Sequence, residues 1–160
     1  ERLARRVHWV YENRQRRKER KQEEPEGAIP SLWRSTREEF RESSRQFVRD
    51  IERKLSMLGC ALLRCEQGTV APVKFSEVEI ECFARAEHER WMVERWERGW
   101  RLDAQKKVEK LASDSLKPWH ELTVEVQDID REFIDKLQSK ILGPEGFVVE
   151  RWPTAPPTTS

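Results

Sequence analysis

A set of side chains that could bind a ligand lies along one predicted helix in the middle of the chain. The set follows the helical spacing i, i+3, i+4, i+7 and i+11: Ala84, Glu87, His88, Trp91 and Arg95. One face of the helix therefore presents a carboxylate, an imidazole, an indole and a guanidinium. Such groups accept a hydrogen bond from an amine, stack on a flat ring and pair with a phosphate. The spacing predicts a ligand-binding face.

The same pattern occurs 80 residues earlier, where His8 and Tyr11 match His88 and Trp91. If the two segments pack about a two-fold axis, the two aromatic rings could face each other across a cleft and hold a flat base between them. We therefore predict ligand-binding roles for both rings and both histidines. Two alternatives are open. The rings could be core residues, and each histidine could hold the loop of its own repeat through a ring nitrogen.

Two arginines each follow a tryptophan by twelve residues: Arg45 follows Trp33, and Arg131 follows Trp119. The residue before each arginine, a serine or an aspartate, can cap a helix, which predicts that both arginines lie in a first helical turn. A cation there opposes the helix dipole, so a carboxylate, a stacked tryptophan or a bound phosphate must compensate it. We predict that both arginines contact phosphate together with Arg95, and that both tryptophans are structural anchors.

Signatures of catalysis and of metal binding are missing from the sequence. It contains no GxSxG, HExxH, P-loop or GxGxxG pattern, and the consecutive Glu87 and His88 point about 100° apart on a helix. The cysteines Cys60, Cys65 and Cys82 lack CxxC spacing, which favours reduced core thiols over a disulfide or a zinc site. We therefore expect no enzyme activity, no cofactor and no metal.

Length and charge exclude several classes of protein. The 160 residues suffice for one domain or two small repeats. Lys and Arg number 31 against 30 Asp and Glu, so the net charge of +1 gives no one-signed field for nucleic acid or anionic lipid. The charged segment 14–26 is expected to be a solvated helix end and loop, with a nucleic-acid contact as the weaker alternative. No apolar run is long enough to span a membrane, so we expect no membrane insertion, no sequence-specific nucleic-acid partner and a cytoplasmic location.

Residues typical of helix ends bound the predicted helix that carries Glu87, His88, Trp91 and Arg95. Ser76 and Glu79 form a capping box at its start, and it runs to about Arg98. Gly99 suits the left-handed position after a helix end. Because one glycine makes no phosphate cradle, Gly99 and Trp100 are predicted to be a helix stop and a packing anchor.

Each half of the chain continues with a second predicted helix and a short strand. The helices cover 44–58 and 130–142, and the strands cover 61–65 and 147–151. The predicted fold class is mainly α with short β strands, an α+β arrangement. Two pseudo-symmetric helix-loop-helix-strand repeats would pack as one module.

The boundaries of the repeats follow from these elements. The first repeat is predicted over 1–65, a linker over 66–74 and the second repeat over 75–152. A tail rich in proline and threonine, 153–160, is predicted to be disordered.

The second half of the chain resembles the ryanodine receptor repeat domain. The resemblance rests on four runs: FARAEHERW at 83–91, GW at 99–100, PWHEL at 118–122 and DR at 130–131. The first half is similar to a diverged copy, with Tyr11 where tryptophan is typical. The resemblance implies a mostly helical tandem-repeat module with short strands, of a kind found in calcium-release channels and in bacterial and phage proteins.

The resemblance also implies a function. In the channels, a pair of such repeats is similar to a binding site for adenine nucleotide and drug-like aromatic compounds, to which the tryptophan after the repeat histidine contributes. Tyr11 and Trp91 occupy that position here. We expect a non-catalytic sensor that binds a nucleotide-type small molecule, such as an adenine or cyclic nucleotide, between its repeats and signals to a fused or neighbouring effector domain. The alternative is a protein–protein interaction or homo-oligomerisation module with exposed tryptophans: Trp9, Trp96 and Trp152.

Overall fold

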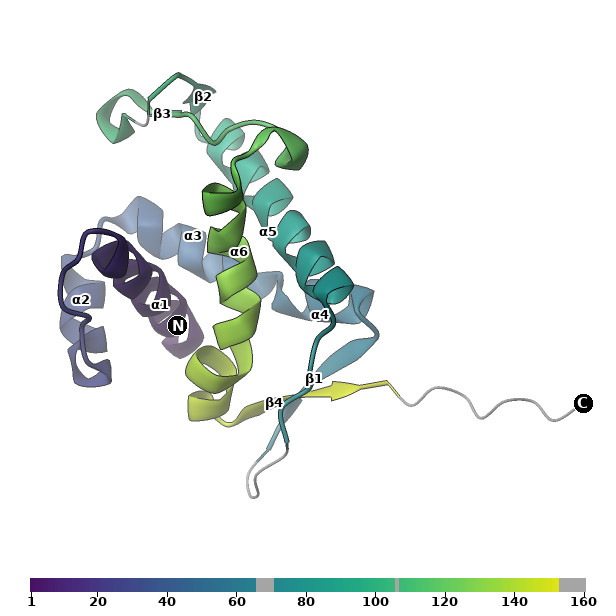
Figure 1. The fold of residues 1–160 in the computed structure, drawn as a ribbon. Helices are drawn as coiled ribbons and strands as arrows, with labels where there is room; N and C mark the ends of the chain where they lie inside the picture. The colour runs from purple at the N-terminus through teal and green to yellow at the C-terminus, as the bar shows by residue number, and fades with distance from the viewer. Residues whose placement is uncertain (66–70, 106, 153–160) are drawn as a thin grey trace, which may run out of the picture.

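Helices from both halves of the chain pack against one another, and a two-stranded sheet joins the ends of the two halves (Figure 1). The computed structural model describes residues 1–65, 71–105 and 107–152. Part of the predicted linker, 66–70, and the predicted tail, 153–160, lie outside the described residues. The fold is mainly α with short β strands, as the sequence predicts.

The first half of the chain contains helices followed by a strand. In chain order these are α1 (Arg2–Lys18), the 3₁₀ turn η1 (Glu26–Ala28), α2 (Ile29–Ser35), α3 (Glu38–Arg49), α4 (Ile51–Met57) and β1 (Cys60–Arg64). Helix α1 packs along α3 and against α2. Its buried face includes Ala4, Val7 and His8, because residues three or four apart share one side of a helix.

The second half also begins with a long helix and ends with a strand, but its helices are joined by a longer connection. It contains α5 (Glu77–Glu97), β2 (Arg101–Leu102), η2 (Val108–Lys110), β3 (Ala112–Ser113), η3 (Trp119–Glu121), α6 (Val124–Lys136), the π-helical turn η4 (Leu137–Leu142), η5 (Gly143–Glu145) and β4 (Phe147–Arg151). Helix α6 packs along α5 as α3 packs along α1.

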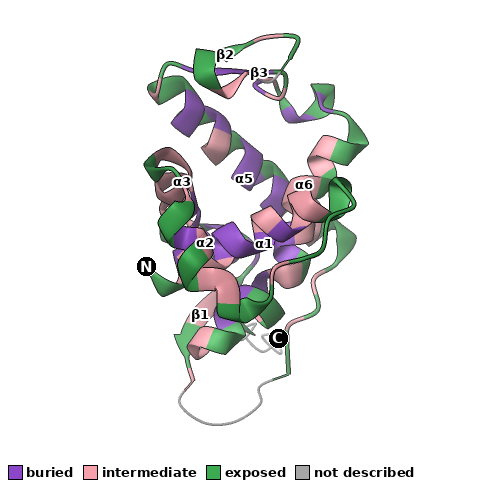
Figure 2. Ribbon diagram, turned by 90° about the vertical axis from the view of Figure 1, so that its left-hand side faces the viewer, coloured by how far each residue is buried: buried purple, intermediate pink, exposed green. Residues whose placement is uncertain are grey.

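Helix α5 lies at the centre of the fold. The predicted capping box is present: the Ser76 hydroxyl accepts from the Glu79 backbone N–H (3.3 Å), and the Glu79 carboxylate accepts from the Ser76 N–H (2.7 Å). The helix ends at Glu97, and Gly99 has a φ of +78°, which confirms the predicted stop. Because α5 contacts α6 on one side and α3 and α4 on another, buried positions occur along most of its length (Figure 2).

The predicted starts of the other two long helices are wrong. Helix α3 begins at Glu38 and α6 at Val124, each six residues before its predicted start at 44 or 130. Ser44, read as a cap, lies inside α3, where its hydroxyl donates to the Phe40 carbonyl one turn back (3.1 Å). The helix starts are indicated better by the acidic residues of the first turn, Glu38 and Glu39 in α3 and Glu125 in α6, which interact favourably with the helix dipole.

The predicted ends of these helices agree better with the structure. The helix predicted over 44–58 is divided at Asp50 into α3 and α4, but it ends at Met57, and Gly59 follows with a φ of +65°. Helix α6 continues through η4 to Leu142, as predicted.

The two predicted strands are confirmed as β1 and β4, and they pair with each other. The pairing is antiparallel, with Leu62 opposite Val149. Each strand directly follows a glycine with positive φ, Gly59 (+65°) or Gly146 (+77°). A second pair, β2 with β3, is parallel, only two residues long and lies at the other end of α5 (Figure 1). The sequence predicts the longer strands but not their pairing.

One hydrophobic core is shared by the two halves. Phe47 of α3 lies between the rings of Phe83 on α5 and Phe133 on α6, with ring centroids 6.3 and 5.2 Å away. Leu55 and Leu137 belong to the same cluster and are fully buried. Because the apolar faces of both halves meet there, neither half completes this core alone.

Candidate ligand-binding site

A cavity of about 160 Å³ lies between α1, α3, α5 and α6. Six of the eight predicted ligand contacts line it: His8, Tyr11, Glu87, His88, Trp91 and Arg95. They come from equivalent faces of α1 and α5, so the two halves contribute one aromatic ring and one histidine each. An apolar protein cavity of about 150 Å³ holds a benzene molecule. The free space here is therefore that of a single flat ring system.

Both histidines hold a loop of their own half through Nε2, which was the alternative to a ligand-binding role. The His88 ring donates from Nε2 to the Lys117 carbonyl (2.9 Å), since a carbonyl only accepts. Nε2 of His8 lies 2.8 Å from the Thr36 hydroxyl, whose hydrogen is donated to the Leu32 carbonyl. Burial lowers the pKa of His8 to about 4 and also lowers the pKa of His88, so both rings are neutral at pH 7.

Arg95 is the charged group with the most unusual surroundings in the cavity. It is 4% exposed, and its guanidinium carbon lies 4.8 Å from the ring centroid of Trp100 and 5.7 Å from those of Trp91 and Phe40. Its Nε and Nη1 have no hydrogen-bond partner in the described part of the chain, and the nearest carboxylate oxygen, on Glu94, is 3.8 Å from Nη1. An arginine with buried, unfilled donors at a cavity is suited to an anionic or carbonyl oxygen.

Glu87, the predicted acceptor for a ligand amine, is engaged by protein cations. Arg90 donates to its Oε1 from Nη2 (2.7 Å), and Lys54 donates to its Oε2 (2.5 Å). Burial alone would raise the pKa of Glu87, but the charges of Lys54 and Arg90 outweigh it and lower the pKa. The Lys54 side chain is fully buried, with Nζ 4.0 Å from the centroid of the Phe47 ring. These contacts give Glu87 a structural role at the wall of the cavity.

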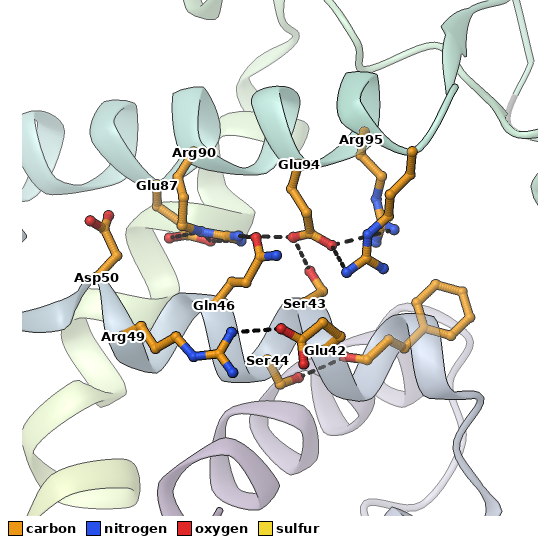
Figure 3. A network of polar contacts seen from close by, with 12 residues as sticks. Glu42, Ser43, Ser44, Gln46, Arg49, Asp50, Glu87, Arg90, Glu94 and Arg95 are labelled. Atoms are coloured by element: carbon orange, nitrogen blue, oxygen red, sulfur yellow. Dashed lines mark hydrogen bonds and ion pairs between the residues drawn. The ribbon is translucent and has the colours of Figure 1, made fainter.

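The ion pairs extend along α5 and fix it to α3 (Figure 3). Arg90 also donates to Glu94 (2.8 Å), whose carboxylate accepts from the Ser43 hydroxyl of α3 (2.8 Å). Figure 3 shows Arg90 and Glu94 pointing from α5 towards the helix that carries Ser43 and Gln46. One wall of the cavity is therefore a charged network between the two halves of the chain.

Arg45, predicted as a phosphate contact, lies outside the cavity and inside α3, not in its first turn. Its Nε donates to Oε2 of Glu1 (3.0 Å), while the Trp33 indole donates to Oε1 of the same carboxylate (2.9 Å). The Arg45 guanidinium carbon lies 5.5 Å from the centroid of the buried Trp33 ring. A carboxylate and a stacked tryptophan thus compensate its charge.

Arg131 has the same arrangement in the other half. It lies inside α6, its Nε donates to Oε2 of Glu81 (2.8 Å), and the indole of the buried Trp119 donates to Oε1 of Glu81 (2.6 Å). The distance from the Arg131 guanidinium to the Trp119 ring centroid is again 5.5 Å. The prediction that both arginines lie in a first helical turn is wrong, and both are paired with carboxylates of their own half.

Asp130 is a cavity residue that sequence reasoning missed. It was read as a helix cap, yet its side chain lines the cavity and is 15% exposed. Oδ2 lies 3.9 Å from Nδ1 of His88. Burial, followed by repulsion from Glu87, raises the pKa of Asp130 well above its ordinary value. The sequence does contain an indication of this position. Asp130 lies on the same helix face as the apolar Val126, Ile129 and Phe133, where burying an acidic side chain is unfavourable unless it has a function.

The tryptophans proposed for protein contacts differ in exposure. Trp9 is not exposed: it is 8% accessible, and its indole donates to the Glu24 carbonyl (2.8 Å). Trp96 and Trp152 are 52% and 59% exposed. The anchor Trp100 is buried against Met92 and Leu116 at the end of α5.

No group of three or more His, Cys, Asp or Glu side chains in 1–65, 71–105 and 107–152 is placed to hold a metal ion. Among the helices of this part of the chain, none combines the length and the apolar character needed to cross a membrane.

The fold and the cavity define a class of small helical module in which two helix pairs enclose a site lined by histidine, aromatic rings and arginine. The family model of the RyR domain matches residues 72–151, half of the chain. The chain belongs to the RyR domain family, which confirms the resemblance for the second half and indicates a regulatory or interaction module. No curated protein gave a significant match.

Proposed function

We propose that this chain is a non-catalytic sensor that binds a nucleotide-type molecule in the cavity between its two halves. The observation that carries the proposal is Arg95: its guanidinium is buried, lies against aromatic rings and has unfilled donors at the cavity. Its ion pair with Glu94 is long, and leaving buried donors without hydrogen bonds is costly, so an oxygen of a ligand would remove that cost. Tyr11 and Trp91 add a flat surface from each half.

The spacing of the cavity residues along α5 suits a mononucleotide. His88 and Arg95 are seven residues apart, which corresponds to about 10 Å along a helix axis. Trp91 lies between them, so a base stacked there would have its edge at His88 and its phosphate towards Arg95. The free volume of about 160 Å³ fits one ring system, so a whole nucleotide requires side chains of the cavity to move.

We further infer that the first half is a diverged second copy of the RyR unit, which would make the module a tandem pair. The repeated Glu–Trp–Arg arrangement supports this inference, since Glu1 and Glu81 are 80 residues apart, as His8 and His88 are. The antiparallel pairing of the two terminal strands also suits a two-fold relation. In such a pair Tyr11 is the counterpart of Trp91.

Thermal unfolding with and without nucleotides tests the sensor. A ligand at about a hundred times its dissociation constant should stabilise the protein by about 2.7 kcal/mol, a shift of a few degrees. Trp91→Ala and Arg95→Met should abolish the shift, whereas Trp96→Ala, an exposed tryptophan on the same helix, should retain it. An unchanged affinity in Trp91→Ala, or no shift of the wild type with any nucleotide, would overturn the proposal.

A protein-interaction module is the second candidate, and one observation favours it. Val93 and Trp96 are 50% and 52% exposed and lie three residues apart on α5, away from the cavity. Large exposed apolar side chains at this spacing can anchor a partner or a second copy. Light scattering separates the two functions: self-association that is lost in Trp96→Ala and insensitive to nucleotides would favour interaction.

A further inference from the structure

His88 and Asp130 line the cavity and face each other from α5 and α6. The hydrogen of the neutral His88 ring is on Nε2, because Nε2 donates to the Lys117 carbonyl. Its Nδ1 therefore carries a lone pair and is an acceptor. The separation of 3.9 Å between Nδ1 and Oδ2 of Asp130 is too long for a hydrogen bond, and both residues line the cavity.

The charges around Asp130 leave its carboxyl without a donor. Glu87 on α5 repels it, while the cations that face it are Arg90 on α5, Lys54 on α4 and Arg14 on α1. Two of these cations are engaged by Glu87 and the third by Glu132. No described residue donates a hydrogen bond to Asp130. Its burial favours the neutral acid, which offers one O–H donor and one carbonyl acceptor.

We propose that Asp130 and His88 determine ligand specificity by selecting an amino-azine edge, an exocyclic amine beside an unprotonated ring nitrogen, as in aminopurine and aminopyrimidine bases. One amine hydrogen is donated to the Asp130 carbonyl oxygen and the other to Nδ1 of His88, and the ring nitrogen accepts the Asp130 O–H. This inference rests on the proposed function, since it requires a base in the cavity.

The histidine makes the selection. A neutral acid can pair with an amino edge or with a keto edge, because it both donates and accepts. Nδ1 of His88 accepts an amine N–H but repels the carbonyl oxygen that a keto base places there. Asp130 makes the selection sensitive to pH: once ionised, it no longer donates to the ring nitrogen of an amino base.

The matched probes are adenosine and inosine 5′-monophosphates, which differ in this edge. At the acidic end of a pH series, calorimetry should give adenosine monophosphate an affinity at least about tenfold higher than inosine monophosphate, the effect of one good hydrogen bond against an unpaired one. The same preference should separate cytidine from uridine monophosphate. Raising the pH should weaken adenosine monophosphate binding as Asp130 ionises.

Two variants of Asp130 and one control sharpen the test. Asp130→Asn keeps a donor and an acceptor but cannot ionise, so the preference should remain and its pH dependence should vanish. Asp130→Leu should weaken adenosine monophosphate binding and remove its pH dependence, because the leucine neither pairs with the base nor ionises. Asp128→Asn, an exposed acid on the same helix that pairs with Arg131, should behave as wild type.

The outcomes distinguish the two proposals. Equal binding of both purine monophosphates, or tighter binding of inosine monophosphate, would overturn this inference while binding that depends on Trp91 would sustain the sensor. If neither these monophosphates nor any other nucleotide binds, the sensor and the inference fail together.

Discussion

Asp130 destabilises the fold because it is a buried acid without a hydrogen-bond donor, and this destabilisation is evidence for a function. Its folded-state pKa is raised by burial and by Glu87, so the folded protein holds this proton more tightly than the unfolded chain does. For such a group, the stabilising contribution is present at low pH and is lost as the pH rises through the folded-state pKa. Above the pKa that this group has in the unfolded chain, keeping it buried without a donor therefore weakens the protein. Proteins commonly retain unfavourable groups of this kind at sites of function.

Asp130→Asn should raise the free energy of unfolding at pH 8 by the order of 1 to 3 kcal/mol, because the amide cannot ionise and is not repelled by Glu87. The gain should shrink as the pH falls and vanish only below the ordinary aspartate pKa of about 3.9, where the wild-type side chain is protonated in both states. Urea unfolding of both proteins across this range measures the difference. The exposed Asp128→Asn is the control, and a lower stability of Asp130→Asn at pH 8 would contradict the reasoning.

How far the site could be predicted from sequence also differs residue by residue. The cavity residues on α1 and α5 were found because helical spacing is local: residues three, four and seven apart must share a face. Arg45 and Arg131 were misplaced because their carboxylate partners are 44 and 50 residues away, at distances that spacing does not reveal. Glu87 was assigned to a ligand because Lys54, 33 residues earlier, has no visible relation to it in the sequence.

At the scale of elements, α5 was predicted almost to the residue because both of its ends carry strong local signals. Ser76 satisfies a backbone N–H at the start, and Gly99 takes the left-handed conformation after the end. Helices α3 and α6 have no side-chain cap at their N-termini, so polar residues inside them were mistaken for caps. The two-residue strands β2 and β3 are too short for any sequence pattern to indicate.

The capping box makes α5 sensitive to a single change at its start. Ser76→Ala removes the acceptor for the Glu79 N–H and should lower the free energy of unfolding by about 1 kcal/mol. Because α5 contacts α3, α4 and α6, the loss should appear in global unfolding and not as local fraying. Chemical denaturation followed by tryptophan fluorescence measures it. Ser56→Ala, at an exposed position of α4, is the control and should change stability by less than about 0.5 kcal/mol.

At the scale of the whole molecule, the two halves depend on each other. Phe47 packs between Phe83 and Phe133, and Lys54 pairs with Glu87 in the interior. Removing one partner of a buried ion pair costs about 3 to 5 kcal/mol, and domains are stable by only about 5 to 15 kcal/mol. Separating the halves removes both contacts at once.

Peptides covering 1–65 and 71–152 should therefore fail to unfold cooperatively when each is studied alone by circular dichroism. The second contains the whole segment matched by the RyR family, so it is the more demanding case. A cooperative transition of 71–152 near the melting temperature of the intact chain would show that the second half is independent. The intact chain under the same conditions is the reference.

The pairing of β1 with β4 has a consequence for how such a module could arise. Each half supplies one strand of a sheet that it cannot complete by itself. If the halves are copies of one unit, as we infer, an ancestor with a single unit could build this sheet and core only as a homodimer, and its folding would depend on protein concentration. Fusion of two copies replaces that dependence with a fixed effective concentration set by the linker. The duplicated gene could then let the two copies diverge, one retaining a tryptophan at the cavity and the other a tyrosine.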